Sequence, residues 1–122
     1  MKITAAVVKE KGGPFVLEEA QLDQPQPQEV LVRIVATGIC HTDMVIRNQQ
    51  MAAPLPMVLG HEGAGVVEAI GIEVTEVAVG DHVVLTFGYC GKCDSCREGF
   101  PTYCEHMLEH NFAGSRPDGS HR

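Results

Sequence analysis

Short apolar runs separated by turn residues dominate the chain, and several of them alternate as strands do. Residues 30–37 alternate most clearly, with Val30, Val32, Ile34 and Ala36 on one face and the residues between them on the other. Residues 3–8 and 15–19 flank the turn sequence KEKGGP and are expected to pair as a hairpin. Residues 64–70 and 82–87 are further valine-rich runs. The pattern predicts a mainly β domain.

Helix is expected to be the minor component. Residues 42–48 predict one short helix, with Thr42 or Asp43 near its start. The segment QPQPQ at residues 24–28 indicates an extended connector, and the polar, glycine-rich stretch from residue 111 indicates a tail. About six short strands at this spacing favour a small β-barrel or sandwich.

Length and charge restrict the possible classes of protein. A chain of 122 residues is expected to form one domain, residues 1–122. The formal charge of −7 argues against nucleic acid as a partner, and it offers no basic patch for an anionic membrane. No apolar run approaches the length of a membrane span, and the first residues lack the apolar core of a secretory signal. The five cysteines, grouped four plus one, suit a reducing compartment, so a cytoplasmic protein is expected.

Four of the cysteines form the run C-x2-C-x2-C-x7-C. This spacing lets one loop surround a single tetrahedral metal ion with thiolate ligands, and zinc is the expected metal. Disulfides are an alternative, although cysteines three residues apart rarely reach disulfide geometry without strain. An iron–sulfur cluster is another, but the bacterial ferredoxin run continues x3-C-P, whereas Glu105 follows the fourth cysteine here. The four residues are Cys90, Cys93, Cys96 and Cys104.

A second group of residues lies upstream, in the segment CHTD at 40–43 and the segment G-H-E-x2-G-x5-G-x2-V at 60–74. Taken alone, a cysteine such as Cys40 is more often a buried small side chain than a ligand, and a histidine such as His61 is more often structural. Together, a thiolate and an imidazole beside glycines can form half of a catalytic zinc site. Glu62 could be an outer ligand or a solvated charge. Asp43 could interact with a helix N-terminus or accept the second ring N–H of a zinc-bound histidine.

With these three motifs in this order, the chain resembles the zinc-dependent alcohol dehydrogenases of the medium-chain dehydrogenase/reductase superfamily. The resemblance covers all 122 residues and implies the N-terminal, GroES-like catalytic domain of that family. It implies a partly open β-barrel with short helices and a structural zinc lobe at residues 88–106, without the C-terminal Rossmann domain. Residues 112–120 look closest to aryl or benzyl alcohol dehydrogenases.

The resemblance also implies a role for each site residue. Cys40 and His61 match two ligands of the catalytic zinc, and Glu62 matches a glutamate that lies beside that zinc and can coordinate it transiently. The structural zinc would be held by Cys90, Cys93, Cys96 and Cys104.

Three further positions match residues that act around the catalytic zinc. Thr42 matches the hydroxyl that takes the alcohol proton, and His41 matches a basic position beside the cofactor pyrophosphate. Asp43 matches the partner of the zinc-bound histidine. The implied reaction is hydride transfer from a small alcohol to NAD(P)+, giving an aldehyde or ketone.

The chain also departs from the family. It has no G-x-G-x-x-G turn for a dinucleotide and no third zinc-binding cysteine after the structural loop. The catalytic zinc site is therefore expected to be weak and the isolated chain inactive; His106, His110 and His121 are given no site role. Strands that return from the C-terminus in the family are missing, so a homo-oligomer or strand exchange between chains is expected. The alternative is a stand-alone zinc-stabilised β module that binds or assembles without catalysis.

Overall fold

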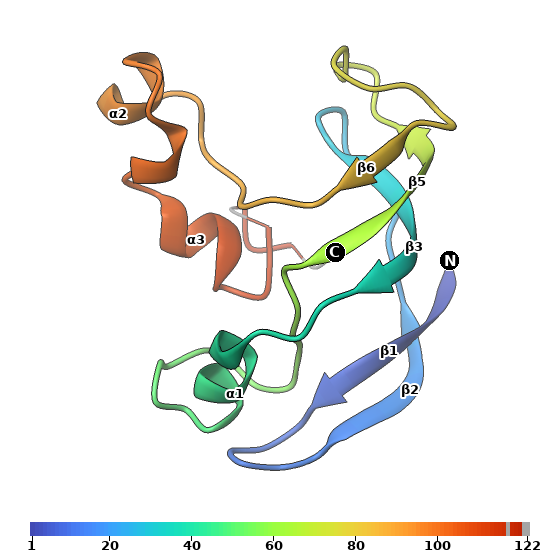
Figure 1. The fold of residues 1–122 in the computed structure, drawn as a ribbon, viewed down its shortest axis with the longest axis vertical. Coiled ribbons are helices and arrows are strands. Elements are labelled where there is room, and N and C mark those ends of the chain that lie inside the picture. Colours follow the sequence, from blue (N-terminus) through green and yellow to red (C-terminus); the bar gives the residue numbers. More distant parts are fainter. Residues whose placement is uncertain (117, 121–122) are drawn as a thin grey trace.

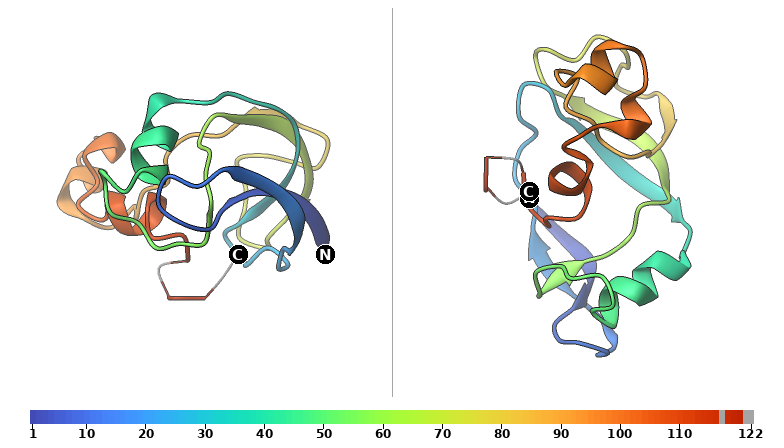
Figure 2. Two further views of the ribbon diagram at one scale, coloured as in Figure 1. Left: turned by 90° about the horizontal axis from the view of Figure 1, so that it is seen from below. Right: turned by 90° about the vertical axis from the view of Figure 1, so that its left-hand side faces the viewer.

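The secondary structure is mainly β, as the sequence predicts. The computed structural model describes residues 1–116 and 118–120. Within them the strands form two three-stranded sheets, ordered β2-β1-β4 and β3-β5-β6. Figures 1 and 2 show that these strands curve around a shared interior. The strands are β1 (Lys2–Val8), β2 (Phe15–Gln21), β3 (Val30–Thr37), β4 (Met57–Val58), β5 (Gly63–Ile70) and β6 (His82–Val84).

The helices are short and lie to one side of the sheets (Figure 1). Helix α1 (His41–Arg47) follows β3. Helix α2 (Asp94–Arg97), the 3-10 turn η1 (Pro101–Tyr103) and helix α3 (Met107–Asn111) form a separate lobe after β6. Helix α1 begins one residue earlier than predicted, and α3 extends into the start of the segment for which the sequence predicts a polar tail.

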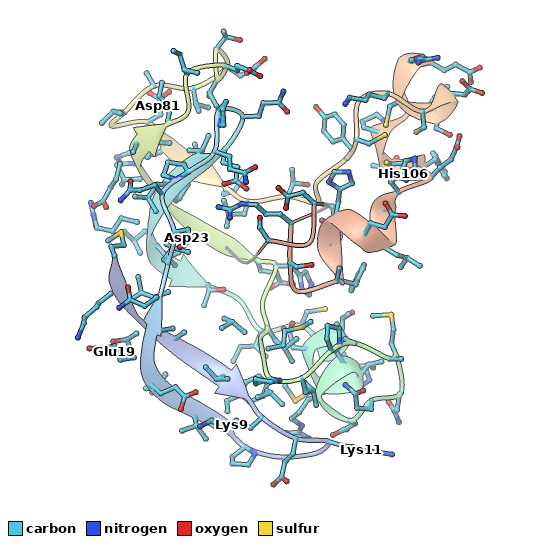
Figure 3. All side chains as sticks on the ribbon, turned by 180° about the vertical axis from the view of Figure 1, so that it is seen from behind. Lys9, Lys11, Glu19, Asp23, Asp81 and His106 are labelled. Carbon is cyan, nitrogen blue, oxygen red and sulfur yellow. The ribbon has the colours of Figure 1, made fainter. Side chains whose placement is uncertain are left out.

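The predicted hairpin is present and in continuous register. Strands β1 and β2 pair antiparallel from Lys2–Gln21 to Val8–Phe15. At its tip Gly12 adopts φ +71°, a conformation that glycine reaches without strain. The Gly12 N–H donates to the carbonyl of Arg47 at 2.9 Å, so the hairpin tip contacts the end of α1. Lys9 and Lys11 mark this tip in Figure 3, where His106 marks the lobe.

The core lies between β1, α1 and β5. Its buried apolar residues include Val8 and Val67, which are almost fully inaccessible, together with Ala5, Val7 and Ile46. These side chains come from three separate stretches of the chain, so their burial holds the two sheets and α1 together. This core therefore fixes α1 and β5, the elements that directly follow the candidate site residues Cys40, His61 and Glu62.

Two of the predicted strands differ from expectation. Strand β3 has register shifts between Leu31 and Val32 and between Ile34 and Ala36, so its regular alternation of faces is broken. No residue of β3 is fully buried. Strand β6 ends at Val84 rather than at residue 87, because the chain leaves the sheet there toward the lobe.

Gly71 packs directly against the backbone of the QPQPQ connector. A Cβ at this position would collide with the carbonyl oxygens of Gln26 and Pro27, which are backbone atoms that cannot rotate away. We expect Gly71→Ala to lower the free energy of unfolding by about 1–3 kcal/mol, as overpacking does. Urea denaturation measures this, with Gly88→Ala as the control, since a Cβ there has no neighbour closer than 3.6 Å. Equal stability of both variants would contradict the packing described.

Candidate metal centres

The four-cysteine lobe brings its sulfur atoms together around one point. Cys93 directly precedes α2, Cys96 lies within that helix, and Cys104 follows η1. The four Sγ atoms all lie within 4.8 Å of one another, and those of Cys90 and Cys96 are 4.0 Å apart. Four thiolates at about 2.3 Å from a tetrahedral zinc would be separated by about 3.8 Å. All five cysteines are free, so the lobe has the reduced thiols that a single ion requires.

Backbone groups already favour a thiolate at one of these positions. The N–H groups of Lys92 and Cys93 donate to the Cys90 Sγ, each at 3.4 Å, and they lower the pKa of Cys90 to about 6. Burial and the neighbouring thiols raise the pKa of Cys96 to about 12. Since a metal binds the deprotonated form, metal binding at this lobe should release the Cys96 proton.

A second group of possible ligands lies beside α1. The donor atoms of Cys40, His61 and Glu62 lie within 4.8 Å of one another. Cys40 is the residue just before α1, whereas His61 and Glu62 lie between β4 and β5, after Gly60 at φ +130°. The sequence therefore identified three residues that the fold does bring together, from two separate loops.

Asp43 positions His61 from inside α1. It is only 4% exposed, and its Oδ2 accepts the Cys40 N–H at 2.9 Å, closing a capping box at the start of the helix. Its Oδ1 lies 3.4 Å from His61 Nδ1 and has no other hydrogen-bond partner among the described residues. An unpartnered buried carboxylate oxygen is costly, so this contact favours a proton on Nδ1. The His61 Nε2, which faces Glu62 at 4.0 Å, is then free to bind a metal.

Thr42 and Glu62 complete the surroundings of Cys40. The Thr42 N–H and hydroxyl, and then His61, lower the pKa of the Cys40 thiol, and its Sγ lies 3.6 Å from Thr42 Oγ1. The Glu62 carboxylate packs over Gly38, where any larger side chain would collide with it. His41, in contrast, is exposed at the first turn of α1.

Sequence reasoning missed the aromatic wall of this site. Phe87 stacks on His61 with ring centroids 5.7 Å apart and planes at 17°, and Phe112 lies 6.2 Å from Phe87. A cavity of about 420 Å³ opens beside these rings and beside His110, to which the sequence assigns no site role. The resemblance of residues 112–120 to aryl or benzyl alcohol dehydrogenases is the one sequence signal of function that includes a residue of this wall, Phe112. His106 instead pairs with Glu109 on the surface, and His121 lies outside the described residues.

Comparison with known proteins identifies the family. The family model for the alcohol dehydrogenase GroES-like domain matches residues 26–122. The chain belongs to this family. Geraniol dehydrogenase from Castellaniella defragrans is 48% identical over 116 residues, which are 94% of this chain and 31% of that protein.

Solved structures of alcohol dehydrogenases have the same fold. Benzyl alcohol dehydrogenase from Acinetobacter calcoaceticus matches with a TM-score of 0.96 and 54% identity, over 99% of this chain and 33% of the other. An alcohol dehydrogenase zinc-binding domain protein from Burkholderia ambifaria matches with a TM-score of 0.95 and 54% identity, over 98% and 32%. The predicted GroES-like, partly open β fold is confirmed, and the chain spans about a third of the length of these relatives. In the part of the chain that the structure describes, no helix is suited by length and apolarity to cross a membrane.

Proposed function

We propose that the chain is the zinc-binding catalytic-domain portion of an NAD(P)-dependent alcohol dehydrogenase, comprising residues 1–122 with its structural zinc lobe at 88–106. The observation that carries the proposal is the convergence of Cys40, His61 and Glu62, of which His61 also lines a cavity with aromatic walls. The alternative of a zinc-stabilised β module without catalysis accounts for the four-cysteine lobe, but it leaves this second donor set without a purpose.

In this proposal the two donor sets have different tasks. The lobe cysteines would hold a structural zinc, and Cys40 and His61, with Glu62 beside them, would hold a catalytic zinc. A zinc ion bound there would supply Lewis acidity, which would make the hydroxyl of an alcohol substrate more acidic. Asp43 keeps the His61 proton on Nδ1 so that Nε2 faces the ion.

The proton and hydride leave the alcohol by separate routes. The Thr42 hydroxyl, next to Cys40, would receive the alcohol proton, and NAD(P)+ would supply the acceptor for the hydride from the carbon bearing the oxygen. The products are an aldehyde or ketone, NAD(P)H and one proton. Exposed His41 is suited to a contact with the cofactor pyrophosphate. Phe87 and Phe112 on the cavity wall suit an apolar alcohol. The names of two relatives, geraniol dehydrogenase and benzyl alcohol dehydrogenase, support the same substrate class.

A chimeric enzyme tests the proposal. This chain would replace the matching N-terminal third of the Acinetobacter benzyl alcohol dehydrogenase, to which it is 54% identical. We expect the chimera to oxidise benzyl alcohol with NAD+, and its His61→Ala variant to lose about a thousandfold or more in kcat/KM, as loss of the metal requires. A folded, zinc-loaded chimera without activity would count against the proposal. The chain by itself is expected to be inactive.

Replacing Asp43 by asparagine should weaken metal binding at the Cys40/His61/Glu62 site. The amide oxygen of the new side chain can still accept the Cys40 N–H and so preserve the start of α1, but the carboxylate that faces His61 is lost. Loss of such a partner lowers metal affinity by about 10–100-fold. Titration with Co²⁺, followed by its visible absorption, measures the change. Unaltered affinity in Asp43→Asn would show that this carboxylate does not support the site.

We also propose that the chain works in a reducing compartment such as the cytoplasm, where the lobe thiols stay reduced.

We further propose that the chain self-associates through the open edges of its sheets. Strands β2 and β6 lie at outer edges of their sheets, and Leu17 on β2 and Val84 on β6 are 74% and 79% exposed. Unpaired edges of this kind favour pairing or strand exchange with a second chain. Light scattering should therefore give a mass above that of one chain; a monodisperse monomer at high concentration would contradict this.

A further inference from the structure

Asn111, the last residue of α3, forms a clasp with Gly88 in the segment between β6 and α2. Its Oδ1 accepts the Gly88 N–H at 2.7 Å, and its Nδ2 donates to the Gly88 carbonyl at 2.9 Å. The same Nδ2 donates to the Met107 carbonyl at 2.9 Å, within α3. One side chain thus satisfies both backbone groups of Gly88, as a neighbouring strand would.

The clasp lies between the two candidate metal centres. On one side, the first residue of α3 is bonded to one of the lobe cysteines: the Met107 N–H donates to the Cys104 carbonyl at 3.1 Å. On the other side, Gly88 is the residue after Phe87, whose ring stacks on His61 at 5.7 Å. Phe87 is 43% exposed, so packing alone holds it only in part, and the adjoining backbone must restrict where its ring lies.

We propose that Asn111 is a positioning residue that couples the four-cysteine lobe to the Cys40/His61/Glu62 site, by holding Phe87 against the His61 ring. An ordered lobe fixes α3, α3 presents the Asn111 amide, and the amide fixes the backbone next to Phe87. The coupling is reciprocal, so order at either centre favours order at the other.

The test compares Asn111→Ala and Asn111→Asp with Glu109→Ala in the 122-residue chain with its lobe loaded with zinc. Glu109 lies on the same helix and pairs with His106 on the surface, so its removal alters α3 without altering the clasp. Aromatic NMR of the parent and of Glu109→Ala should give nuclear Overhauser effects between the His61 and Phe87 rings. Asn111→Ala should lose them, together with the exchange protection of the Gly88 amide.

A second readout is the affinity of the Cys40/His61/Glu62 site for Co²⁺, which should fall about fivefold or more in Asn111→Ala, as coupled sites do. Parent-like ring contacts in a folded Asn111→Ala chain would overturn the proposal. If Asn111→Ala does not fold, Asn111→Asp replaces it, because the aspartate still accepts the Gly88 N–H but cannot donate to the Gly88 and Met107 carbonyls. His61–Phe87 ring contacts and a Co²⁺ affinity equal to the parent's in Asn111→Asp would then overturn the proposal. Only the Co²⁺ readout depends on the proposed metal site at Cys40, His61 and Glu62. Loss of the ring contacts in a chain that never binds Co²⁺ would refute that site and still support Asn111.

Discussion

Replacing Cys104 by serine is expected to weaken zinc binding at the four-cysteine lobe and to loosen the lobe as far as α3. Cys104 is the buried member of the set, and its sulfur accepts the Cys90 N–H at 3.3 Å. A structural zinc site contributes about 10–16 kcal/mol, so losing one of four ligands should cost about 3 kcal/mol, roughly a hundredfold in affinity. Elemental analysis and hydrogen exchange over residues 90–111 measure the two effects.

Cys40→Ser is the matched control, because it makes the same chemical change at the cysteine outside the lobe. It should leave the lobe zinc and the exchange of residues 90–111 as in the parent. If Cys104→Ser keeps zinc with the parent's affinity, the lobe is not a four-thiolate site.

Replacing Arg116 by alanine should lower the free energy of unfolding by about 2–3 kcal/mol. Arg116 is only 6% exposed and forms a bidentate pair with Glu29, with Nε–Oε1 and Nη2–Oε2 distances of 2.8 and 2.9 Å. It also donates to the Gln24 carbonyl at 3.4 Å, so it ties the segment after α3 to the connector before β3. Breaking a fully buried pair costs about 3–5 kcal/mol, and the value is smaller here because the Glu29 side chain is 30% exposed.

Arg33→Ala tests whether burial is the cause. Arg33 pairs with Glu68 at a similar distance, 2.9 Å, but both side chains are largely exposed, at 56% and 40%. Its loss should change stability by no more than about 1 kcal/mol. Urea denaturation of the two variants should therefore differ clearly; equal losses would mean that the Arg116 pair contributes no more than a surface pair does.

Local sequence patterns predicted the β content and the hairpin, because strand pairing there depends on adjacent residues. They predicted a strand to residue 87, whereas β6 ends at Val84. Leu85 still donates to the Gly63 carbonyl, but Gly88 takes its hydrogen bonds from the Asn111 side chain, 23 residues away. The bulges in β3 were missed for a related reason, since they depend on the register with β5 rather than on the apolar pattern of β3.

The candidate site was predicted unevenly. The spacing of the lobe cysteines implies a single centre, because one short loop supplies all four. The convergence of Cys40 with His61 depends on the pairing of β3 with β5, so the residue types and their glycines could only suggest it, and the family resemblance assigned the roles. Phe87 and His110 were missed because stacking and cavity lining are set by tertiary packing. The roles of Thr42 and His41 stay predictions.

Native mass spectrometry of the chain titrated with zinc shows whether two distinct donor sets bind metal. We expect a first zinc that resists chelation in the parent and is removed by the chelator in Cys104→Ser, and a second, weaker zinc that is lost in His61→Ala and retained in Cys104→Ser. A chain that binds no zinc, or binds a single zinc that His61→Ala removes and Cys104→Ser does not, would show that the two donor sets are not two metal centres.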